Sequence, residues 1–301
     1  MSLLTIIRRP ESIRHFKHPR STKLMCPTVE LEPNYAEAVR IMTGGLGRAE
    51  LELATSFAMP LYWIYREGDG YRVRNGTCFF LDTGQAMFGV TARHVIDQFR
   101  ADRQNHKVSA MNISTDPGVP IDLDGTNGII DEDEAIDIAT FRIEQGQIDK
   151  SKKTVLRGHQ ADWPPQPPQE GRGIYYSGYP EIETIWPRRY EINFGAAPAS
   201  GIATSVSDQS VSSQIERQHL TAAFGKGIPP ENYDFSGLSG GPMLTVVQGT
   251  LRSWRLAGVI IQGPNNRNDA NRPAIADLEI IRARRADFIN PDGTLNRQRP
   301  I

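Results

Sequence analysis

Short apolar runs, separated by Gly, Asp and Asn, make up most of the chain from residue 57 onward. Runs such as FAMPLYWIYRE, YRVRNGTCFFLD and QAMFGVTARHV are rich in β-branched and aromatic residues, which favour strands over helices. Similar runs, including GIYYSGYP, GGPMLTVVQ and WRLAGVIIQG, follow a proline-rich stretch near the middle of the chain. The pattern predicts an all-β protein with about six strands in each half.

The proline-rich stretch DWPPQPPQEGRG predicts a boundary between these halves. Proline lacks a backbone donor and cannot continue a strand or a helix. We therefore expect a first β-domain over residues 51–162, a linker over 163–172 and a second β-domain over 173–272.

The two ends of the chain lack this strand pattern. Residues 1–50 begin with a basic, aperiodic stretch and are expected to form an extension, with a short helix over NYAEAVRIMTGG ended by Gly44 and Gly45. Residues 273–301 are expected to form a C-terminal helix and tail, because apolar residues recur there near a helical period after a proline. These apolar residues are Ile275, Leu278, Ile281 and Ile289.

Composition and charge exclude several classes of function. The chain is 39% hydrophobic and 23% charged, as soluble globular proteins are. Its 34 basic and 35 acidic residues leave a net charge of −1, so no global field attracts nucleic acid or an anionic membrane. No segment approaches the roughly 20 apolar residues of a membrane span and no signal sequence is evident, which predicts a cytoplasmic protein.

The two cysteines allow at most one disulfide. Cys78 lies in the apolar run GTCFFL and is predicted to be a buried, reduced thiol, while a pairing with Cys26 is left open. The Asn-Gly-Thr sequon at Asn75 carries little weight without a secretory signal.

The stretch DFSGLSGGPMLTVV contains the candidate nucleophile, Ser239. A serine hydroxyl becomes nucleophilic when a neighbouring base takes its proton, and the resulting oxyanion needs hydrogen-bond donors. The surrounding glycines allow a tight turn whose N–H groups point into one concavity, and the N–H groups of Gly237 and Ser239 are the predicted donors. The alternative is a structural glycine turn with an ordinary serine.

His94 is the predicted base among six histidines. It follows the apolar run from Met87 to Thr91, which places its imidazole at the end of a buried strand. No metal site is predicted at His15 and His18, because further ligand-type residues are lacking nearby. Five histidines lie in polar segments and are expected at the surface, namely His15, His18, His106, His159 and His219.

Asp137 is the predicted orienting carboxylate. It stands between Ile136 and the apolar run IATF, a setting that is unusual for a carboxylate without a partner. The alternative is an aspartate that only caps a strand. Asp97, three residues after His94, is less favoured, and the acidic run DEDE at 131–134 is expected to be a solvated turn.

The motifs VTARHV, DIATF and GLSGGPML, in this order, resemble the His, Asp and Ser motifs of the chymotrypsin-like (trypsin-like, clan PA) serine proteases, in particular their bacterial members. The resemblance covers roughly residues 55–290. It implies two six-stranded antiparallel Greek-key barrels, a triad of His94, Asp137 and Ser239, and an oxyanion hole at the N–H groups of Gly237 and Ser239. The implied chemistry requires no metal and no organic cofactor.

Two further segments support the resemblance. GRGIYYSGYP is similar to the strand that opens the second barrel in bacterial relatives, and AGVIIQG is similar to the strand that follows the nucleophile. In the family the latter strand pairs with substrate backbone, which implies substrate contacts for Ile261, Gln262 and Gly263. The base of the specificity pocket would be Tyr233, which favours a small or medium apolar side chain, or Asp234, which favours Lys or Arg.

Leu238 departs from the animal digestive members, which carry Asp before the nucleophile. In those members the Asp pairs with a new N-terminal amine after zymogen cleavage, so this activation is not expected here. Control of activity through residues 1–50 is the hypothesis that replaces it.

The sequence therefore predicts a serine endopeptidase that acts on polypeptide substrates. The alternative is a protease-like module that binds peptides without turnover, or that acts only when a protein partner engages residues 1–50. Neither nucleic acid nor a membrane is an expected partner.

Overall fold

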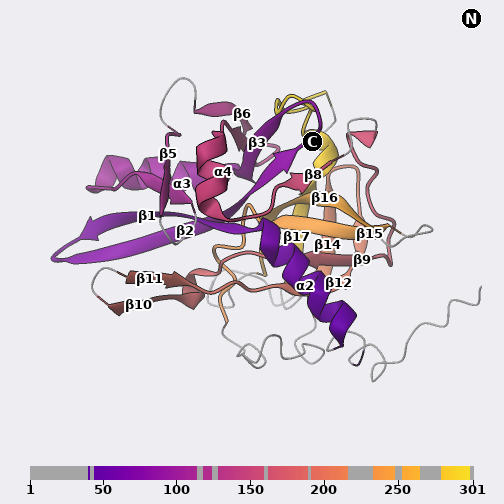
Figure 1. The fold of residues 1–301 in the computed structure, drawn as a ribbon, viewed down its shortest axis with the longest axis horizontal. Helices are drawn as coiled ribbons and strands as arrows, with labels where there is room; N and C mark the ends of the chain where they lie inside the picture. The colour runs from indigo at the N-terminus through magenta and orange to yellow at the C-terminus, as the bar shows by residue number, and fades with distance from the viewer. Residues whose placement is uncertain are drawn as a thin grey trace, which may run out of the picture.

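The computed structural model describes residues 40, 44–113, 118–123, 128–158, 162–188, 191–215, 233–247, 253–264 and 279–298. These residues form two curled antiparallel sheets that pack against each other (Figure 1). The architecture is the all-β, two-barrel arrangement of the chymotrypsin-like fold, as the sequence predicts, but among the described residues the two sheets have eight and seven strands rather than six each.

The first sheet, called the first barrel below, has the strand order β5-β4-β1-β2-β3-β7-β6, and β8 pairs in parallel with β2. The long β1–β2 hairpin projects from the body of the protein (Figure 1). The strands are β1 (Met59–Glu67), β2 (Gly70–Asp82), β3 (Met87–Ala92), β4 (Met111–Ile113), β5 (Val119–Ile121), β6 (Ile129–Asp133), β7 (Ile138–Phe141) and β8 (Leu156–Arg157).

The second sheet, called the second barrel below, has the order β12-β9-β15-β16-β17-β14-β13. A Cβ atom added to Gly201 would lie 2.8 Å from Oγ of Ser213, so β12 and β14 approach each other and the sheet curls on itself. The strands are β9 (Gly173–Tyr176), β12 (Ala199–Ile202), β13 (Ser205–Val206), β14 (Ser210–Ile215), β15 (Pro242–Val247), β16 (Ser253–Gln262) and β17 (Glu279–Arg285).

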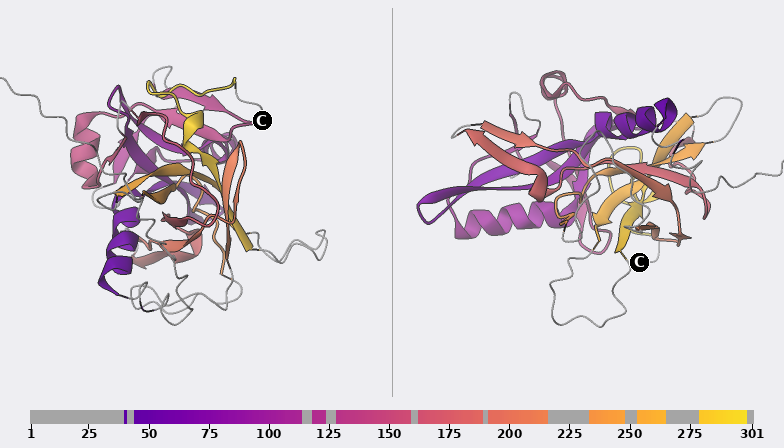
Figure 2. Two further views of the ribbon diagram at one scale, coloured as in Figure 1. Left: turned by 90° about the vertical axis from the view of Figure 1, so that its right-hand side faces the viewer. Right: turned by 90° about the horizontal axis from the view of Figure 1, so that it is seen from below.

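A separate hairpin of β10 (Thr184–Arg188) and β11 (Glu191–Phe194) lies beside the β1–β2 hairpin. The ring of Phe194 packs against that of Tyr62, with 4.8 Å between centroids. Through this contact the first half of the chain packs against the second at a place outside the region where the two sheets meet (Figure 2).

The helices pack against the sheets, α3 against the first barrel and α2 against the layer between the two. In α3, Val95, Ile96 and Phe99 recur at helical spacing and are buried in the core of the first barrel. The helical elements of the described residues are α2 (Gly45–Phe57), α3 (Arg93–Asn105), α4 (Gln145–Ser151) and the short 3₁₀ turns η2 (Glu181–Glu183) and η5 (Ala286–Phe288).

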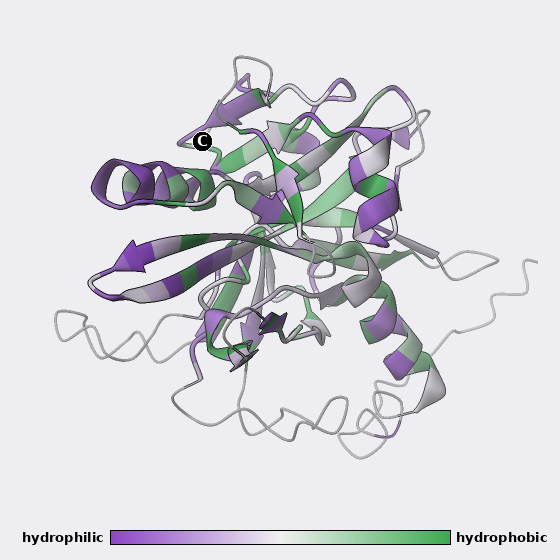
Figure 3. Ribbon diagram, turned by 60° about the vertical axis from the view of Figure 1, so that its left-hand side comes forward, coloured by the Kyte–Doolittle hydropathy of each residue, from purple (hydrophilic) through white to green (hydrophobic). Residues whose placement is uncertain are grey.

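Apolar side chains fill both barrels and the layer between them. Phe80 and Phe141 are buried inside the first barrel, and Met243 and Ile260 inside the second. A third cluster, which includes Phe88, contains residues of both sheets and of α2. Figure 3 shows hydrophobic segments where the sheets pack and hydrophilic ones on α3 and the β1–β2 hairpin. Because one apolar layer joins the barrels, residues carried by different sheets can be held in a fixed relation.

The predicted C-terminal helix is wrong, because residues 279–285 form strand β17 and only a short 3₁₀ turn follows. Ile281 and Ala283 are two positions apart and both are fully buried, which is the period of a strand. β17 pairs with β14 on one side and β16 on the other, so the second barrel continues to Arg285, beyond the expected limit at residue 272.

Three other local predictions can be compared with the structure. Gly44 and Gly45 stand at the beginning of α2. Most of the segment NYAEAVRIMTGG lies outside the described residues, although its Arg40 is helical, so the short helix expected there stays a prediction. α2 also crosses the expected limit at residue 50, since its Leu51 and Ala54 pack into the layer between the sheets. The acidic run at 131–134 is not a solvated turn, because its first three residues belong to β6 and are only partly exposed.

Candidate active site

His94 and Asp137 form a direct pair at one end of the first barrel. Nδ1 of His94 lies 2.9 Å from Oδ2 and 3.1 Å from Oδ1 of Asp137, and the backbone N–H of His94 donates to Oδ1 at 3.0 Å. The other side-chain nitrogen of His94 is left for a further partner, and the His94 side chain is 48% exposed. This is the orientation that the sequence predicts for a base and its orienting carboxylate.

The backbone at the junction of β3 and α3 positions His94. β3 ends at Ala92, which has extended backbone angles, and α3 begins at Arg93. The N–H of Arg93 donates to the carbonyl oxygen of Asp137 at 3.2 Å. His94 therefore lies in the first turn of a helix that is anchored in the core by Val95, Ile96 and Phe99.

Asp137 occupies an unusual backbone conformation. Its φ is 59°, in the left-handed region that few residues other than glycine enter, although aspartate and asparagine do so more readily than most. Its N–H donates to the carbonyl oxygen of Asp133 at 2.9 Å, which closes the turn between β6 and β7. The turn directs the carboxylate toward α3, so Asp137 does more than cap a strand.

Asp97 has other partners. It forms ion pairs with Arg93 and with Arg100, the latter at 3.7 Å, on the surface of α3. The orienting carboxylate of His94 in this structure is accordingly Asp137.

The segment around Ser239 forms the tight turn that its glycines predict. Gly237 and Gly240 have φ values of 99° and 90°, which glycine adopts without strain. The N–H groups of Leu238 and Gly241 donate to the carbonyl oxygens of Phe235 and Leu238, at 3.1 and 3.0 Å. Ser239 therefore stands at the tip of a hydrogen-bonded turn just before β15.

This turn is attached to the first barrel at β2 and at the end of β3. The N–H of Thr77 donates to the carbonyl oxygen of Ser239 at 2.9 Å. A Cβ atom on Gly240 would lie 1.9 Å from the carbonyl oxygen of Thr77 and 3.0 Å from the backbone nitrogen of Ala92, two residues before His94. The close approach brings the Ser239 turn to the end of β3, where His94 and Asp137 are held.

The orientations of the Gly237 and Ser239 N–H groups follow from hydrogen bonds to the carbonyl oxygens of the same peptide units. The carbonyl oxygen of Ser236 accepts from the N–H of Glu181 at 2.7 Å, and that of Leu238 accepts from Gly241. Because a trans peptide is planar, the N–H on its far side points the opposite way. The N–H groups of Gly237 and Ser239, which belong to these two peptides, thus have defined orientations.

Two polar residues of β2 support this arrangement and are not recognised by sequence reasoning. Oγ1 of Thr77 donates to the carbonyl oxygen of Gly237 at 2.7 Å and accepts from the N–H of Tyr179 at 2.9 Å. Nδ2 of Asn75, which is 5% exposed, donates to the carbonyl oxygen of Tyr179 at 2.6 Å. The one available signal is a cluster of polar residues, RNGT, in a strand that otherwise becomes apolar.

Leu238 is buried, 1% exposed, within the core of the second barrel. A Cβ atom on Gly178 would lie 2.8 Å from its Cδ2. The residue before Ser239 is thus an apolar anchor in the core of the second barrel.

The two candidate pocket residues make local contacts. The hydroxyl of Tyr233 donates to Oε1 of Glu183 at 3.0 Å, and burial together with this carboxylate raises the pKa of the phenol. Oδ1 of Asp234 accepts from both the N–H and the hydroxyl of Ser236, at 2.8 Å each. Which of them forms the base of a pocket stays a prediction.

The three predicted substrate-contacting residues lie at the end of β16, beside the Ser239 turn. The N–H of Gly240 donates to the carbonyl oxygen of Ile260 at 2.7 Å, which places Ile261, Gln262 and Gly263 directly after this contact. A Cβ atom on Gly263 would lie 3.3 Å from Cβ of Phe235, so the two segments are adjacent. Their contacts with substrate stay a prediction.

Other sequence predictions concern residues away from this site. Cys78 is buried and free, as predicted, and burial raises the pKa of its thiol, whereas Cys26 lies outside the described residues. His106 stacks against Tyr65, with 5.2 Å between ring centroids. His15, His18, His159 and His219 lie outside the described residues. None of the helices that the structure describes has the length and apolar character needed to cross a membrane.

No protein-family model matches the sequence, and no curated protein matches it. Among solved structures, the chain is similar to one described with the coupled folding and binding of the intrinsically disordered Sesbania mosaic virus VPg protein, with a TM-score of 0.38 and 11% identity over 77% of this chain and 93% of that one. It is also similar to one described as the structure of GrC, with a TM-score of 0.41 and 12% identity over 77% of this chain and 90% of that one. At these TM-scores the trypsin-like fold rests on the two curled sheets themselves.

Proposed function

We propose that this chain is a serine endopeptidase of the trypsin-like type, with His94, Asp137 and Ser239 as its catalytic residues. The observation that supports it most directly is the His94–Asp137 pair, held at the end of β3 where the Ser239 turn packs. A base, its orienting carboxylate and a hydroxyl on a glycine turn are the parts that acyl transfer needs.

In this proposal Oγ of Ser239 attacks the carbonyl carbon of the scissile peptide, and its proton passes to Nε2 of His94. The N–H groups of Gly237 and Ser239 donate to the oxyanion that develops. His94 then gives the proton to the leaving amine as the C–N bond breaks, which leaves an acyl ester on Ser239. A water molecule, deprotonated by His94, hydrolyses the ester and restores the hydroxyl. Throughout, Asp137 keeps Nδ1 protonated and stabilises the imidazolium.

The polypeptide substrate would lie along the end of β16 and enter a pocket beside Tyr233 and Asp234. Peptide cleavage profiling decides between the two pocket residues. A preference for Lys or Arg assigns the base to Asp234, and a preference for small or medium apolar residues assigns it to Tyr233.

Labelling with a fluorophosphonate probe tests the proposal. The wild-type protein should be labelled at Ser239, and the variants Ser239→Ala and His94→Ala should not. Ser236→Ala is the matched control, because Ser236 belongs to the same loop but its hydroxyl donates to Asp234; this variant should label as the wild type does. Absence of both labelling and peptide cleavage in the wild type, together with saturable peptide binding, would assign the chain to the alternative class of peptide-binding modules.

The N-terminal region is proposed as a regulatory segment for a protein partner. Since α2 packs into the layer between the sheets, a deletion that tests this role should end before Gly45. Removal of residues 1–39 should change activity while the thermal midpoint of unfolding is kept. Unchanged activity, alone and in an extract that supplies partners, would contradict the role.

A further inference from the structure

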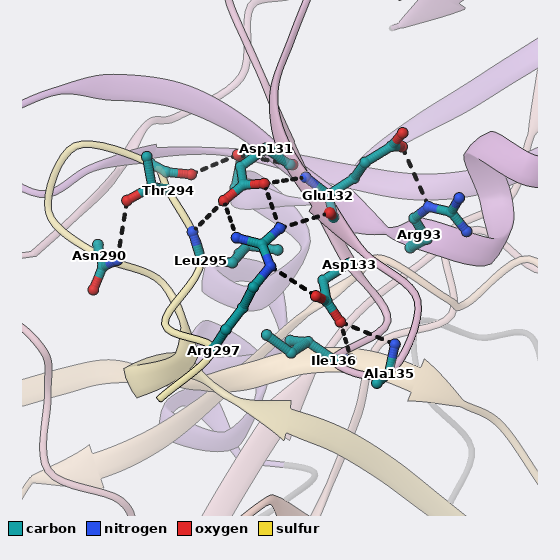
Figure 4. Close-up of polar contacts among 12 residues, drawn as sticks. Arg93, Asp131, Glu132, Asp133, Ala135, Ile136, Asn290, Thr294, Leu295 and Arg297 are labelled. Carbon is teal, nitrogen blue, oxygen red and sulfur yellow. Dashed lines mark hydrogen bonds and ion pairs between the residues drawn. The ribbon is translucent and has the colours of Figure 1, made fainter. Parts of the chain in front are cut away.

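Two arginines from the last part of the chain hold the turn that carries Asp137. Arg284 comes from β17 of the second barrel, and Arg297 comes from the segment 290–298 that follows it. Figure 4 shows Arg297 between β6 and the turn after it, with its guanidinium directed toward the carboxylates of Asp131 and Asp133. The turn that carries the proposed catalytic carboxylate and the strand before it are thus contacted by residues 148 and 166 positions later in the chain.

Arg297 uses all three of its guanidinium nitrogens. Nη1 and Nη2 donate to the two oxygens of Asp131 at 2.8 and 2.6 Å, and Nε donates to Oδ2 of Asp133 at 2.8 Å. Nη2 also donates to the carbonyl oxygen of Glu132 at 2.9 Å. A planar guanidinium can bridge two carboxylates and a backbone carbonyl in this way, whereas an ammonium group acts as a single point charge.

Asp133 transmits this contact to Asp137. Its Oδ1 accepts from the N–H groups of Ala135 and Ile136, at 3.0 Å each, and its carbonyl oxygen accepts from the N–H of Asp137 at 2.9 Å. Three backbone N–H groups of the turn therefore donate to Asp133, whose second carboxylate oxygen is bound by Arg297. A displacement of Asp133 would displace Asp137 with it.

Arg284 holds the backbone of the same turn. Its Nε and Nη2 donate to the carbonyl oxygens of Ile136 and Ala135, at 2.7 and 2.9 Å. The residue is 8% exposed. Burial lowers the pKa of its guanidinium, and the nearby charge of Asp137 opposes that effect. The turn is thus held by two cations, one buried and one at the surface.

The segment that carries Arg297 is itself docked on the first barrel. Oγ1 of Thr140 donates to the carbonyl oxygen of Gly293 at 2.6 Å, and the N–H of Leu295 donates to Oδ2 of Asp131 at 2.8 Å. The side chain of Leu295 is 4% exposed. These contacts fix the backbone just before Arg297, so the position of its side chain does not depend on the ion pairs alone.

We propose that Arg297 is a positioning residue and that the segment 290–298 acts as a clamp, which keeps the turn 133–137 in the conformation that directs Asp137 to His94. The proposal rests on the proposed peptidase function for its catalytic consequence. Its physical basis is that a residue other than glycine stays in the left-handed region only when its surroundings determine it. Without the clamp the turn can relax, and the carboxylate can leave Nδ1 of His94.

Three variants test the clamp. Arg297→Ala removes it, and Arg297→Lys keeps the charge but cannot bridge both carboxylates. Arg72→Ala is the matched control, since it removes an exposed ion pair of 3.1 Å with Glu67 in the β1–β2 hairpin. All are assayed well below their thermal midpoints, so that unfolded protein does not contribute. The readouts are kcat, the acid limb of the pH–rate profile, and the downfield NMR resonance of the His94 Nδ1 proton, assigned by its loss in His94→Gln.

With the clamp removed, kcat should fall by about 10- to 100-fold, the cost of a small misplacement at a catalytic centre. The acid limb should move to lower pH, because a displaced carboxylate no longer stabilises the imidazolium, and the Nδ1 resonance should weaken or disappear. Arg297→Lys should recover part of each change, and Arg72→Ala should match the wild type. A folded Arg297→Ala protein that keeps the wild-type resonance and acid limb would overturn the proposal, even with a lowered thermal midpoint.

The two proposals can fail separately. If the wild-type protein shows neither labelling nor cleavage, the peptidase proposal fails, but the NMR resonance still tests the clamp. Loss of the resonance in Arg297→Ala and its retention in Arg72→Ala would then support the clamp, and retention in both would overturn it.

Discussion

The hydroxyl of Thr77 donates a hydrogen bond of 2.7 Å to the carbonyl oxygen of Gly237, which joins the first barrel to the turn that carries Ser239. The same hydroxyl accepts from the N–H of Tyr179, and the N–H of Thr77 donates to the carbonyl oxygen of Ser239. One fully buried residue thereby links β2 with two segments of the second barrel. The Ser239 turn is built by the second barrel but is positioned by the first.

Replacement of Thr77 by valine should lower activity more than substrate affinity. Valine has nearly the same shape but cannot donate, so the carbonyl oxygen of Gly237 and the N–H of Tyr179 lose a partner at a cost of about 1–3 kcal/mol in unfolding free energy. We expect kcat to fall roughly tenfold, less than the roughly 10²-fold or greater loss when a whole oxyanion donor is removed, with KM little changed. Steady-state kinetics and chemical denaturation measure both effects.

Thr77→Ser is the control for this prediction, because it keeps the hydroxyl. It should retain most of the wild-type kcat. A serine variant as slow as the valine variant would show that the methyl group, rather than the hydrogen bond, is what matters.

Replacement of Gly240 by alanine should destabilise the protein and abolish activity. The new Cβ would stand 1.9 Å from the carbonyl oxygen of Thr77, and the residue would keep a φ of 90° that costs roughly 1–3 kcal/mol outside glycine. Overpacking adds about the same amount. Gly146→Ala in α4 is the matched control, since nothing lies within 4 Å of its added Cβ, and it should be neutral or slightly stabilising. Equal thermal midpoints for the two variants would contradict the close approach at Gly240.

Replacement of Asp137 by asparagine should separate catalysis from folding. Asparagine also tolerates the left-handed region, so the turn should persist and stability should change little. Its amide no longer selects the tautomer of His94 that leaves Nε2 free, which should reduce kcat by about 10⁴-fold. Asp97→Asn is the comparison, because Asp97 pairs with arginines on α3. A loss of activity in Asp97→Asn equal to that in Asp137→Asn would reassign the orienting carboxylate.

The carboxylates that Arg297 binds should make stability depend on pH in the acid range. Partial burial would by itself raise the pKa of Asp131 and of Asp133, but hydrogen bonds from Arg297 and from backbone N–H groups outweigh it and hold each pKa below its ordinary value. Their contribution is therefore complete above the unfolded pKa, near 4, and is lost as pH falls through the lower folded pKa.

Chemical denaturation between about pH 2.5 and pH 6 measures this dependence. The wild-type protein should lose unfolding free energy as the pH falls below about 4, and Asp131→Asn should lose less over the same interval. Identical slopes for the two proteins would contradict the assignment of the acid dependence to this cluster.

Much of the site follows from local pattern. The glycines around Ser239, the strand that ends beside His94 and the apolar neighbours of Asp137 are all legible in the sequence, because each reflects a requirement of a few consecutive residues. The structure adds the direct contact between His94 and Asp137, as predicted. The helix wrongly predicted over residues 279–285 shows where local pattern is not enough. The side chains there fit both the helical and the strand period, and pairing with β14 and β16 selects the strand.

The sequence by itself determined the β-rich class, the order of the three candidate catalytic residues and the tight turn at Ser239, since strand period, residue type and glycine freedom act over short distances. Only the tertiary structure decided what holds these parts together. Thr77 meets Gly237 across 160 positions, and Arg297 meets Asp131 across 166. The sequence around a threonine or an arginine carries no sign of such a partner, because hydrogen bonds and ion pairs between distant residues exist only once the two sheets and the last segment have packed.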